Sequence, residues 1–504
     1  MKNIFKYSKK NNQISLFLLT IFFVFTAIMI MYARSGFING DTPWHISVGN
    51  WILENKKIPI KDIFSQFTII DGKDLFFIAH EWLFDVILAF LHKVGKLNLV
   101  YLFSIITVFC GYLFSVFKSN GNKLLASIVF FILVLVGFNK DIYIIPDTLA
   151  TIILIINNYI LVKYIKENNS KKLKNLLISN CLLVILLANV HGGMLIANLL
   201  QQIIILLCNI IFNKKIKESV IILSCTLFTS LLNPRGWIVY SYSKMLHNEA
   251  AKYLIDYEPF YFNNVKQIAV VGILFLLIIF GIFIKLKVEK NKNNIYIDII
   301  LLCMFFGMLL RYQRTLNIFL FALLLYSVRY IEESLKSLKN TYFKINLKKK
   351  FNGFKIFVFL ILIVLNIIII PNKIEKNQTI NEYCNKNYIS KAMIEYIQEE
   401  KAKNENYKIF NSLELGGFLI SYNINPYIDG RIDCYSKSYG EQSIIEEYMK
   451  SIHSIDLLNK VTRRENIDCL ILKKNSLSTQ IVYASNLWEL KEESNEVALF
   501  VRIK

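Results

Sequence analysis

Apolar residues follow one another in long runs along this chain, rather than recurring at the spacing of a soluble helix or strand. The first run, ISLFLLTIFFVFTAIMIMY, has the roughly 20 residues that a helix needs to cross a bilayer. It exceeds the roughly 7–15 apolar residues of a cleaved signal peptide, so we expect an uncleaved signal anchor. Ten more runs are centred near residues 107, 131, 153, 183, 203, 225, 277, 303, 323 and 363. The pattern predicts a polytopic α-helical membrane protein with about eleven transmembrane helices.

The charge of the chain fits this topology. The 504 residues are 55% apolar, with a formal net charge of +21. Lysines crowd into KSNGNK, KYIKENNSKKLKN, NKKIKE and KLKVEKNKNN, which all fall on one side of the membrane if the amino terminus is cytoplasmic. Because cytoplasmic loops carry the excess of Lys and Arg, the charge indicates orientation and not nucleic-acid binding. We expect a plasma-membrane protein with a cytoplasmic amino terminus and an extracytoplasmic carboxyl end; a lipid-binding role for the basic segments stays open.

The first outer loop, residues 33–96, carries GDTPWHISVG where the first span ends. Thr42 suits the cap of a helix and Pro43 its first turn. Asp41 then stands just ahead of a helix amino terminus, whose dipole favours the ionised carboxylate. His45 lies about one turn further on. We expect Trp44 to anchor this helix at the lipid headgroups.

The same loop ends in AHEWLFDVILAFLHKVG, which is amphipathic but too short and polar to span. Glu81, Asp85 and His92 share one face, and apolar side chains form the other. The pattern predicts a helix in the membrane interface, with Trp82 at headgroup depth. Asp85 and His92 are interpreted as part of the solvated face, whereas Glu81 and the adjacent His80 are candidates for a site.

Further candidates lie on the same side of the membrane. Arginine forms bidentate hydrogen bonds with phosphate, so the arginines at the outer ends of spans are candidates for a phosphate site. The alternative is that they anchor the spans at the membrane interface. A histidine near membrane depth is a candidate for function. The outer loops also supply two acids and one asparagine. These residues are Arg235, Arg311, Arg314, His191, Asn233, Asp256 and Glu258.

The composition changes after residue 371, and residues 372–504 alternate helix and strand patterns. NYISKAMIEYIQEEKAK, EQSIIEEYMKSI and SIDLLNKVTRR read as helices, while YKIFNS, IDCLILKK and WELKEESNEVALFVRI read as strands. This predicts a small extracytoplasmic α/β domain after a transmembrane domain of residues 1–371. NPYIDGR reads as a strand ending in a turn, so Asp429 and Arg431 are candidates for binding, with a local ion pair as the alternative.

Several segments give the chain a family resemblance. GDTPWHISVGNWILENKKIPIKDIFS, AHEWLFDVI, LANVHGGMLIA, SLLNPRGW and NSLELGGFLISYNINPYIDGRIDCYSKSYG resemble a bacterial branch of the GT-C superfamily of polytopic glycosyltransferases. The resemblance spans nearly the whole chain. It implies that Asp41, the early acid of the first outer loop, is the catalytic base. Many members pair this acid with an adjacent one; here Thr42 follows, which leaves Glu81 as the partner and puts metal use in doubt.

These observations predict a glycosyltransferase that moves a sugar, with inversion, from a polyprenyl-phosphate donor to a glycan, lipid or protein acceptor at the outer face. The alternatives are a non-catalytic scaffold of envelope polysaccharide assembly with the same fold, and a lipid or glycan transporter. A divalent cation stays open as a cofactor, because four neighbouring side chains could ligate a metal: Asp41, His45, His80 and Glu81. Their spacing, however, assigns no metal site. The predicted catalytic residues are Asp41, Glu81 and His45, the phosphate-binding ones Arg235, Arg311 and Arg314, and the substrate-binding ones His80, His191, Asn233, Asp256, Glu258, Asp429 and Arg431.

Overall fold

The computed structural model describes residues 2–67, 69–70, 73–74, 76–167, 173–212, 215–241, 252–342, 358, 360–366, 377–435 and 443–503. The chain up to residue 342 is almost entirely helical. Its elements are α1 (Lys2–Ser35), α2 (Asp41–Asn55), β1 (Ile69–Ile70), β2 (Lys73–Asp74), α3 (Trp82–Lys118), α4 (Lys123–Leu135), α5 (Pro146–Lys166), α6 (Leu173–Val190), α7 (Met194–Ile211), α8 (Ile216–Ser230), η2 (Ile255–Tyr257), α10 (Val265–Val288), α11 (Asn293–Arg311), η3 (Gln313–Thr315), α12 (Leu316–Tyr326) and α13 (Val328–Tyr342).

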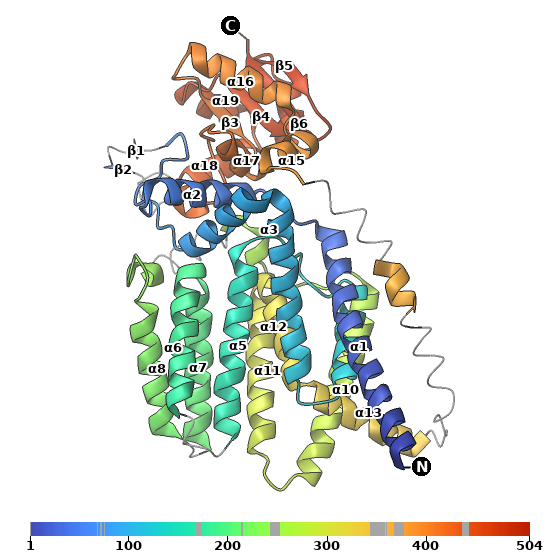
Figure 1. The fold of residues 1–504 in the computed structure, drawn as a ribbon. Coiled ribbons are helices and arrows are strands. Elements are labelled where there is room, and N and C mark those ends of the chain that lie inside the picture. The colour runs from blue at the N-terminus through green and yellow to red at the C-terminus, as the bar shows by residue number, and fades with distance from the viewer. Residues whose placement is uncertain are drawn as a thin grey trace.

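The long helices stand side by side as a bundle, and a smaller unit of strands and short helices sits on one end of it (Figure 1). Among the described residues, seven helices are long and apolar enough to cross a membrane. They are α1, α3, α5, α6, α7, α10 and α11. A bent pair, residues 313–326 and 328–339 with 54° between them, makes an eighth if it counts as one span. The predicted fold class, a polytopic helical membrane protein, is confirmed.

The prediction of eleven spans exceeds what the described residues contain. The runs near residues 131, 225 and 323 do form helices, but α4, α8 and α12 have only 13, 15 and 11 residues. At 1.5 Å per residue the longest of these rises about 23 Å, short of the roughly 30 Å hydrocarbon core. The run near 363, like the proposed boundary at residue 371, lies largely outside the described residues.

Successive helices run in alternating directions between the two ends of the bundle. At one end, Arg34 donates hydrogen bonds to the carbonyl oxygens of Val134 and Leu135. At the other end, Lys166 and Arg329 form ion pairs with the buried Asp298. The amino terminus lies at this second end and the carboxyl terminus beyond the first (Figure 1). The alternation agrees with the lysine pattern, which predicts that the first end is extracytoplasmic.

Thiol labelling tests this orientation. Glu399 is exposed on α16 (Lys391–Lys403) of the carboxyl-terminal unit. We expect a Glu399→Cys variant to react with a membrane-impermeant thiol reagent in intact cells. The unsubstituted chain is the control, because Cys384, Cys434 and Cys469 are buried free thiols. Labelling that requires permeabilised cells would reverse the orientation.

Buried amide side chains join α5, α6, α7 and α8. Asn157 donates to Asn198 at 3.0 Å, and Asn180 donates to Thr226 at 2.8 Å. Gln202 donates to Asn180 at 3.2 Å. Hydrogen bonds of this kind stabilise helix packing in membranes by about 0.6 kcal/mol on average. They fix the helices whose outer ends carry the site described below.

The first outer loop covers the end of the bundle. Helix α2 and the first part of α3 lie across it, beneath the carboxyl-terminal unit (Figure 1). Helix α3 breaks at Gly95 and Lys96, where the backbone leaves helical geometry, so the predicted interface helix and the following span are separate segments. Trp44 is not the headgroup anchor that the sequence predicts. Trp44 is buried (6% exposed) against the carboxyl-terminal unit, and Trp82 donates a hydrogen bond to Asn189 of α6.

The carboxyl-terminal unit contains a four-stranded mixed sheet in the order β3-β4-β6-β5, in which β3 and β4 are parallel and the other pairs antiparallel. The predicted helices and the strands over YKIFNS, IDCLILKK and the terminal hairpin are confirmed. Its elements are α15 (Ile380–Asn387), α16, β3 (Ile409–Asn411), η4 (Leu413–Leu415), α17 (Gly416–Ser421), η5 (Ile432–Tyr435), α18 (Ile444–Ser451), α19 (Ile455–Arg464), β4 (Cys469–Lys473), α20 (Leu477–Tyr483), β5 (Trp488–Glu493) and β6 (Val497–Arg502).

The predicted strand at NPYIDGR is wrong. This segment is irregular, because its backbone groups bond to side chains and to the outer loop rather than to a sheet. Asn411 donates from its side chain to the carbonyl oxygen of Ile428 and accepts from the amide of Tyr427. The amide of Gln66, in the outer loop, donates to the carbonyl oxygen of Pro426. The segment therefore joins the two parts of the molecule.

A buried ion cluster strengthens this junction. Arg431 is 2% exposed and pairs with Asp62 of the outer loop at 2.6 Å and with Asp429 at 2.7 Å. Tyr435 also donates to Asp429, at 2.6 Å. Burial lowers the pKa of Arg431, but the two carboxylates outweigh it and hold that pKa well above its usual value. Asp429 and Arg431 are thus fully occupied with each other and with the loop.

Candidate active site

Asp41 occupies the first turn of α2, at the junction. Thr42 is not the cap: the side-chain oxygen of Asn39 accepts from the amides of Asp41 and Thr42, both at 3.2 Å. The Asp41 carboxylate accepts from the Asn39 side chain at 3.0 Å and from the Trp44 indole at 3.2 Å. Asp41 as a residue remains partly exposed.

Gly430 explains why the irregular segment can approach so closely. A Cβ atom on Gly430 would lie 1.9 Å from a carboxylate oxygen of Asp41 and 3.2 Å from the Trp44 indole nitrogen. A Cβ on Gly417 would lie 1.9 Å from the carbonyl oxygen of Gly40. Only glycine permits these contacts. The carboxyl-terminal unit therefore forms one wall of the space around Asp41.

His45 lies one turn along α2 and is buried (1% exposed). Its Nδ1 atom forms a 2.6 Å hydrogen bond with Asp85, which has no exposed surface. Its Nε2 atom faces Glu81 at 4.0 Å. The interpretation of Asp85 as a solvated-face residue is therefore wrong: Asp85 orients His45. His92 lies apart and accepts a hydrogen bond from the amide of Ile380.

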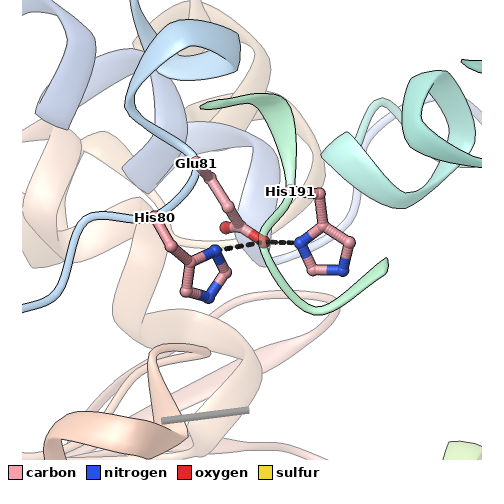
Figure 2. Close-up of side chains that lie close together, drawn as sticks. All are labelled: His80, Glu81 and His191. Atoms are coloured by element: carbon pink, nitrogen blue, oxygen red, sulfur yellow. Dashed lines mark ion pairs between the residues drawn. The ribbon is translucent and has the colours of Figure 1, made fainter. Parts of the chain in front are cut away.

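Glu81 begins a chain of charged side chains drawn from four segments at this end of the bundle. His191, between α6 and α7, places Nδ1 2.6 Å from Glu81 and Nε2 2.7 Å from Asp147 at the start of α5. Arg314 donates to the other oxygen of Asp147 at 2.7 Å. His80 places Nδ1 3.7 Å from the same Glu81 oxygen that faces His191 (Figure 2).

The cluster shifts the pKa values of its members. Burial raises the pKa of Glu81, but the imidazoles of His80 and His191 outweigh it and lower that pKa to about 2. Burial lowers the pKa of His191, but Asp147 and Glu81 outweigh it and raise it to about 9. Burial lowers the pKa of His80 to about 4. At neutral pH, Glu81 and His191 are therefore an ion pair beside a neutral His80.

Asp41 and His45 differ from this pattern. Burial raises the pKa of Asp41, and the charge of His45 and the hydrogen bonds of Trp44 and Asn39 only partly oppose the shift. We expected the helix amino terminus to favour the ionised carboxylate of Asp41. Desolvation, which favours the protonated form, has the larger effect. Burial lowers the pKa of His45, but the hydrogen bond and charge of Asp85 outweigh it and raise that pKa above its usual value.

Other predicted site residues have structural contacts. Arg235 donates to the carbonyl oxygens of Ile78 and Pro59 and so holds the outer loop. Asn233 bonds within its own turn, accepting from the amide of Arg235 at 2.8 Å. Asp256 pairs with Lys140 at 2.6 Å. The Glu258 carbonyl oxygen accepts from the amide of Gln313. Arg311 is exposed and packs on Tyr312.

Three residues of the cluster escaped the sequence prediction: Asn39, Asp85 and Asp147. Asp147 could have been recognised as a candidate, because the pair Pro-Asp begins a predicted span on the outer side. Asn39 could have been recognised too, since asparagine ahead of a helix is a common cap. Asp85 could not, because its partner is 40 residues away on another helix.

An open, mostly apolar hollow adjoins the cluster, between α3 and the start of α5. Its lining includes Phe84 and Thr148, the sequence neighbours of Asp85 and Asp147. The remaining lining residues are Phe103, Ser104, Thr107, Tyr143, Ile144, Ile145 and Leu149.

Comparison with solved structures identifies the architecture. The structure of the Archaeoglobus fulgidus oligosaccharyltransferase in the apo form matches with a TM-score of 0.54 at 10% identity, over 90% of this chain and 69% of that one. The Archaeoglobus fulgidus enzyme AglB, in complex with an inhibitory peptide and a dolichol-phosphate, matches with a TM-score of 0.53 at 11% identity and the same coverage. These enzymes are members of the GT-C superfamily. The chain has the GT-C fold.

The GT-C fold confirms the resemblance seen in the sequence at the level of architecture. The likeness covers both the bundle and most of the rest of the chain, although only about one residue in ten is identical. No protein-family model matches this sequence, and no curated protein matches it. Residue roles on this GT-C fold must therefore be argued from the side chains themselves.

Proposed function

We propose that the protein transfers a sugar from a polyprenyl-phosphate donor to an acceptor at the extracytoplasmic face, with inversion and with Asp41 as the base. One observation carries the proposal: a partly exposed acid stands beside a buried charged cluster at one end of a GT-C bundle. The similar enzyme AglB forms a complex with a dolichol-phosphate and an inhibitory peptide, which supports a lipid-linked donor and a separate acceptor for this chain.

Asp41 suits the role of base better than the other acids. In an inverting transfer, a carboxylate takes the proton of the acceptor as the acceptor attacks the anomeric carbon and the phosphate leaves with the bonding electrons. Asp85 is fully buried and engaged with His45. Glu81 is held by His191. Asp41 is partly exposed, and its raised pKa strengthens it as a base.

The other residues of the site orient one another and neutralise charge. His45 adds positive charge near Asp41, and Asp85 fixes its ring. Arg311 is exposed at the end of α11, three residues before Arg314. We assign Arg311 to the donor phosphate and Arg314 to Asp147.

A comparison of lipid extracts tests the proposal. Cells without the gene are expected to accumulate a polyprenyl-phosphate sugar and to lose a surface glycan that contains that sugar. The wild-type gene should reverse both changes, and the Asp41→Asn gene neither. If Asp41→Asn restores the wild-type profile, the protein acts as a scaffold. If deletion leaves lipids and glycans unchanged, the transfer proposal fails.

Substitution of the two arginines tests the phosphate assignment. Arg311→Ala should lower kcat/KM for the donor by a factor that corresponds to about 1.5–3 kcal/mol, the value of a hydrogen bond to a charged group. Arg314→Ala removes the ion pair with Asp147, so its effect on kcat/KM reports on the charged cluster and not on the phosphate. Lys290→Ala, an exposed cation at the opposite end of the bundle, is the control and should leave kcat/KM unchanged. Equal kcat/KM in all three variants would make the arginines structural.

A further inference from the structure

Three side chains of the cluster converge from segments far apart in the sequence. His80 and Glu81 precede α3, and His191 lies in the turn between α6 and α7. Each offers one ligand atom for a metal ion, and these atoms all lie within 4.8 Å of one another. Their side chains are only 9%, 14% and 10% exposed. Both imidazoles present Nδ1 to the same carboxylate oxygen (Figure 2).

One of the two printed distances to the Glu81 oxygen is close to the spacing of ligand atoms around a bound ion. Ligand atoms about 2.0–2.2 Å from one tetrahedral ion lie roughly 3.3–3.6 Å apart. His80 Nδ1 already lies 3.7 Å from Glu81 Oε1. His191 Nδ1 lies at 2.6 Å from it, a hydrogen-bonding distance, so an ion would take the place of the proton between them. Small rotations of the side chains would complete the geometry.

His191 also has the second partner that metal-binding histidines usually have. Its Nε2 atom faces Asp147 at 2.7 Å, and Arg314 holds the other oxygen of Asp147. A carboxylate on the far nitrogen fixes the tautomer and the orientation of a ligating imidazole. Only one ring nitrogen of His191 is then available for the ion.

We propose that His80, Glu81 and His191 bind one divalent transition-metal ion of the zinc class, with Asp147 orienting His191. Two imidazoles and a carboxylate suit zinc, cobalt, nickel or ferrous iron, whereas magnesium and calcium prefer oxygen ligands alone. Three protein ligands leave a fourth position open to another molecule. The proposal goes beyond sugar transfer, and ion binding is measurable without turnover, so either proposal can fail alone.

Metal analysis of the purified full-length protein tests this site. The protein, without a polyhistidine tag, is dialysed against Zn²⁺ and then against metal-free buffer, and the ion content is measured by mass spectrometry. We expect about one zinc per wild-type chain. His80→Ala, His191→Ala and Glu81→Gln should each weaken Zn²⁺ binding at least tenfold. His453→Ala, an exposed histidine outside the cluster, is the matched control and should bind as the wild type does.

Asp147 provides a finer test. Asp147→Asn should weaken Zn²⁺ binding about 10–100-fold, the usual effect of removing such an orienting carboxylate, while one ion still binds at saturation. X-ray absorption of the zinc-loaded wild type should show scattering from two imidazoles, and this measurement does not require any variant to fold. An absence of bound zinc in the monodisperse wild type, a spectrum with oxygen ligands only, or wild-type affinity in both histidine variants would overturn the proposal.

Discussion

Replacement of Asp41 with asparagine is expected to reduce sugar transfer by about 10²–10⁴-fold, the usual contribution of a general base. Asparagine keeps the size of the side chain but cannot accept the proton of the acceptor. It can still accept from the Trp44 indole, so the first turn of α2 should stay intact. We therefore expect normal abundance and donor binding, measured beside initial rates in membranes or detergent.

Two comparisons make the Asp41 result specific. Asp456 is an acid in the first turn of α19, away from the cluster, and Asp456→Asn should leave the rate unchanged. His45→Ala should give a partial loss, because it removes a neighbouring charge and not the base. An Asp41→Asn protein that is abundant, binds donor and transfers sugar at the wild-type rate would exclude Asp41 as the base.

The second large effect concerns stability. Arg431→Met should lower the free energy of unfolding by about 3–5 kcal/mol, because it leaves the carboxylates of Asp62 and Asp429 buried without their cation. The guanidinium also lies 5.2 Å and 5.1 Å from the ring centres of Phe64 and Phe77, so packing is lost as well. A lower thermal midpoint of the purified protein is the expected measurement.

A surface ion pair and a rescue variant serve as controls for Arg431. Arg464 binds both oxygens of Glu447 but is 41% exposed, so Arg464→Met should cost less than about 1 kcal/mol. Adding Asp62→Asn and Asp429→Asn to Arg431→Met should recover part of the lost stability, because no buried charge then remains unpaired. Equal midpoints for Arg431→Met and Arg464→Met would show that the buried cluster contributes little.

The sequence predicted the fold where local pattern decides it. Apolar runs marked the place of each bundle helix, and the amphipathic stretch after His80 marked the interface helix. Local pattern could not supply the number of true spans, because a short apolar helix such as α4 has the same composition as a spanning one. The strand expected at NPYIDGR failed because tertiary contacts with Gln66 and Asn411 override its local preference.

Only part of the site could be predicted, because the sequence shows local pattern and not tertiary contacts. Asp41, His45, Glu81 and His191 stood out because polar residues are conspicuous beside spans. Their partners could not be read from spacing, since the contacts of His191 join three outer turns. For Asp429 the sequence left a binding role and a local ion pair open, and its carboxylate pairs with Arg431 within the junction.

The junction has a consequence for how the protein is made. Asp62 and Arg431 are 369 residues apart in the chain. At a synthesis rate of about 5–20 residues per second, roughly 20–70 s separate the emergence of the two residues from the ribosome. During that interval the first loop has been synthesised, but the segment with Gly430 that packs against Asp41 has not. Every newly made molecule therefore passes through a state in which the carboxyl-terminal unit does not yet cover its first loop.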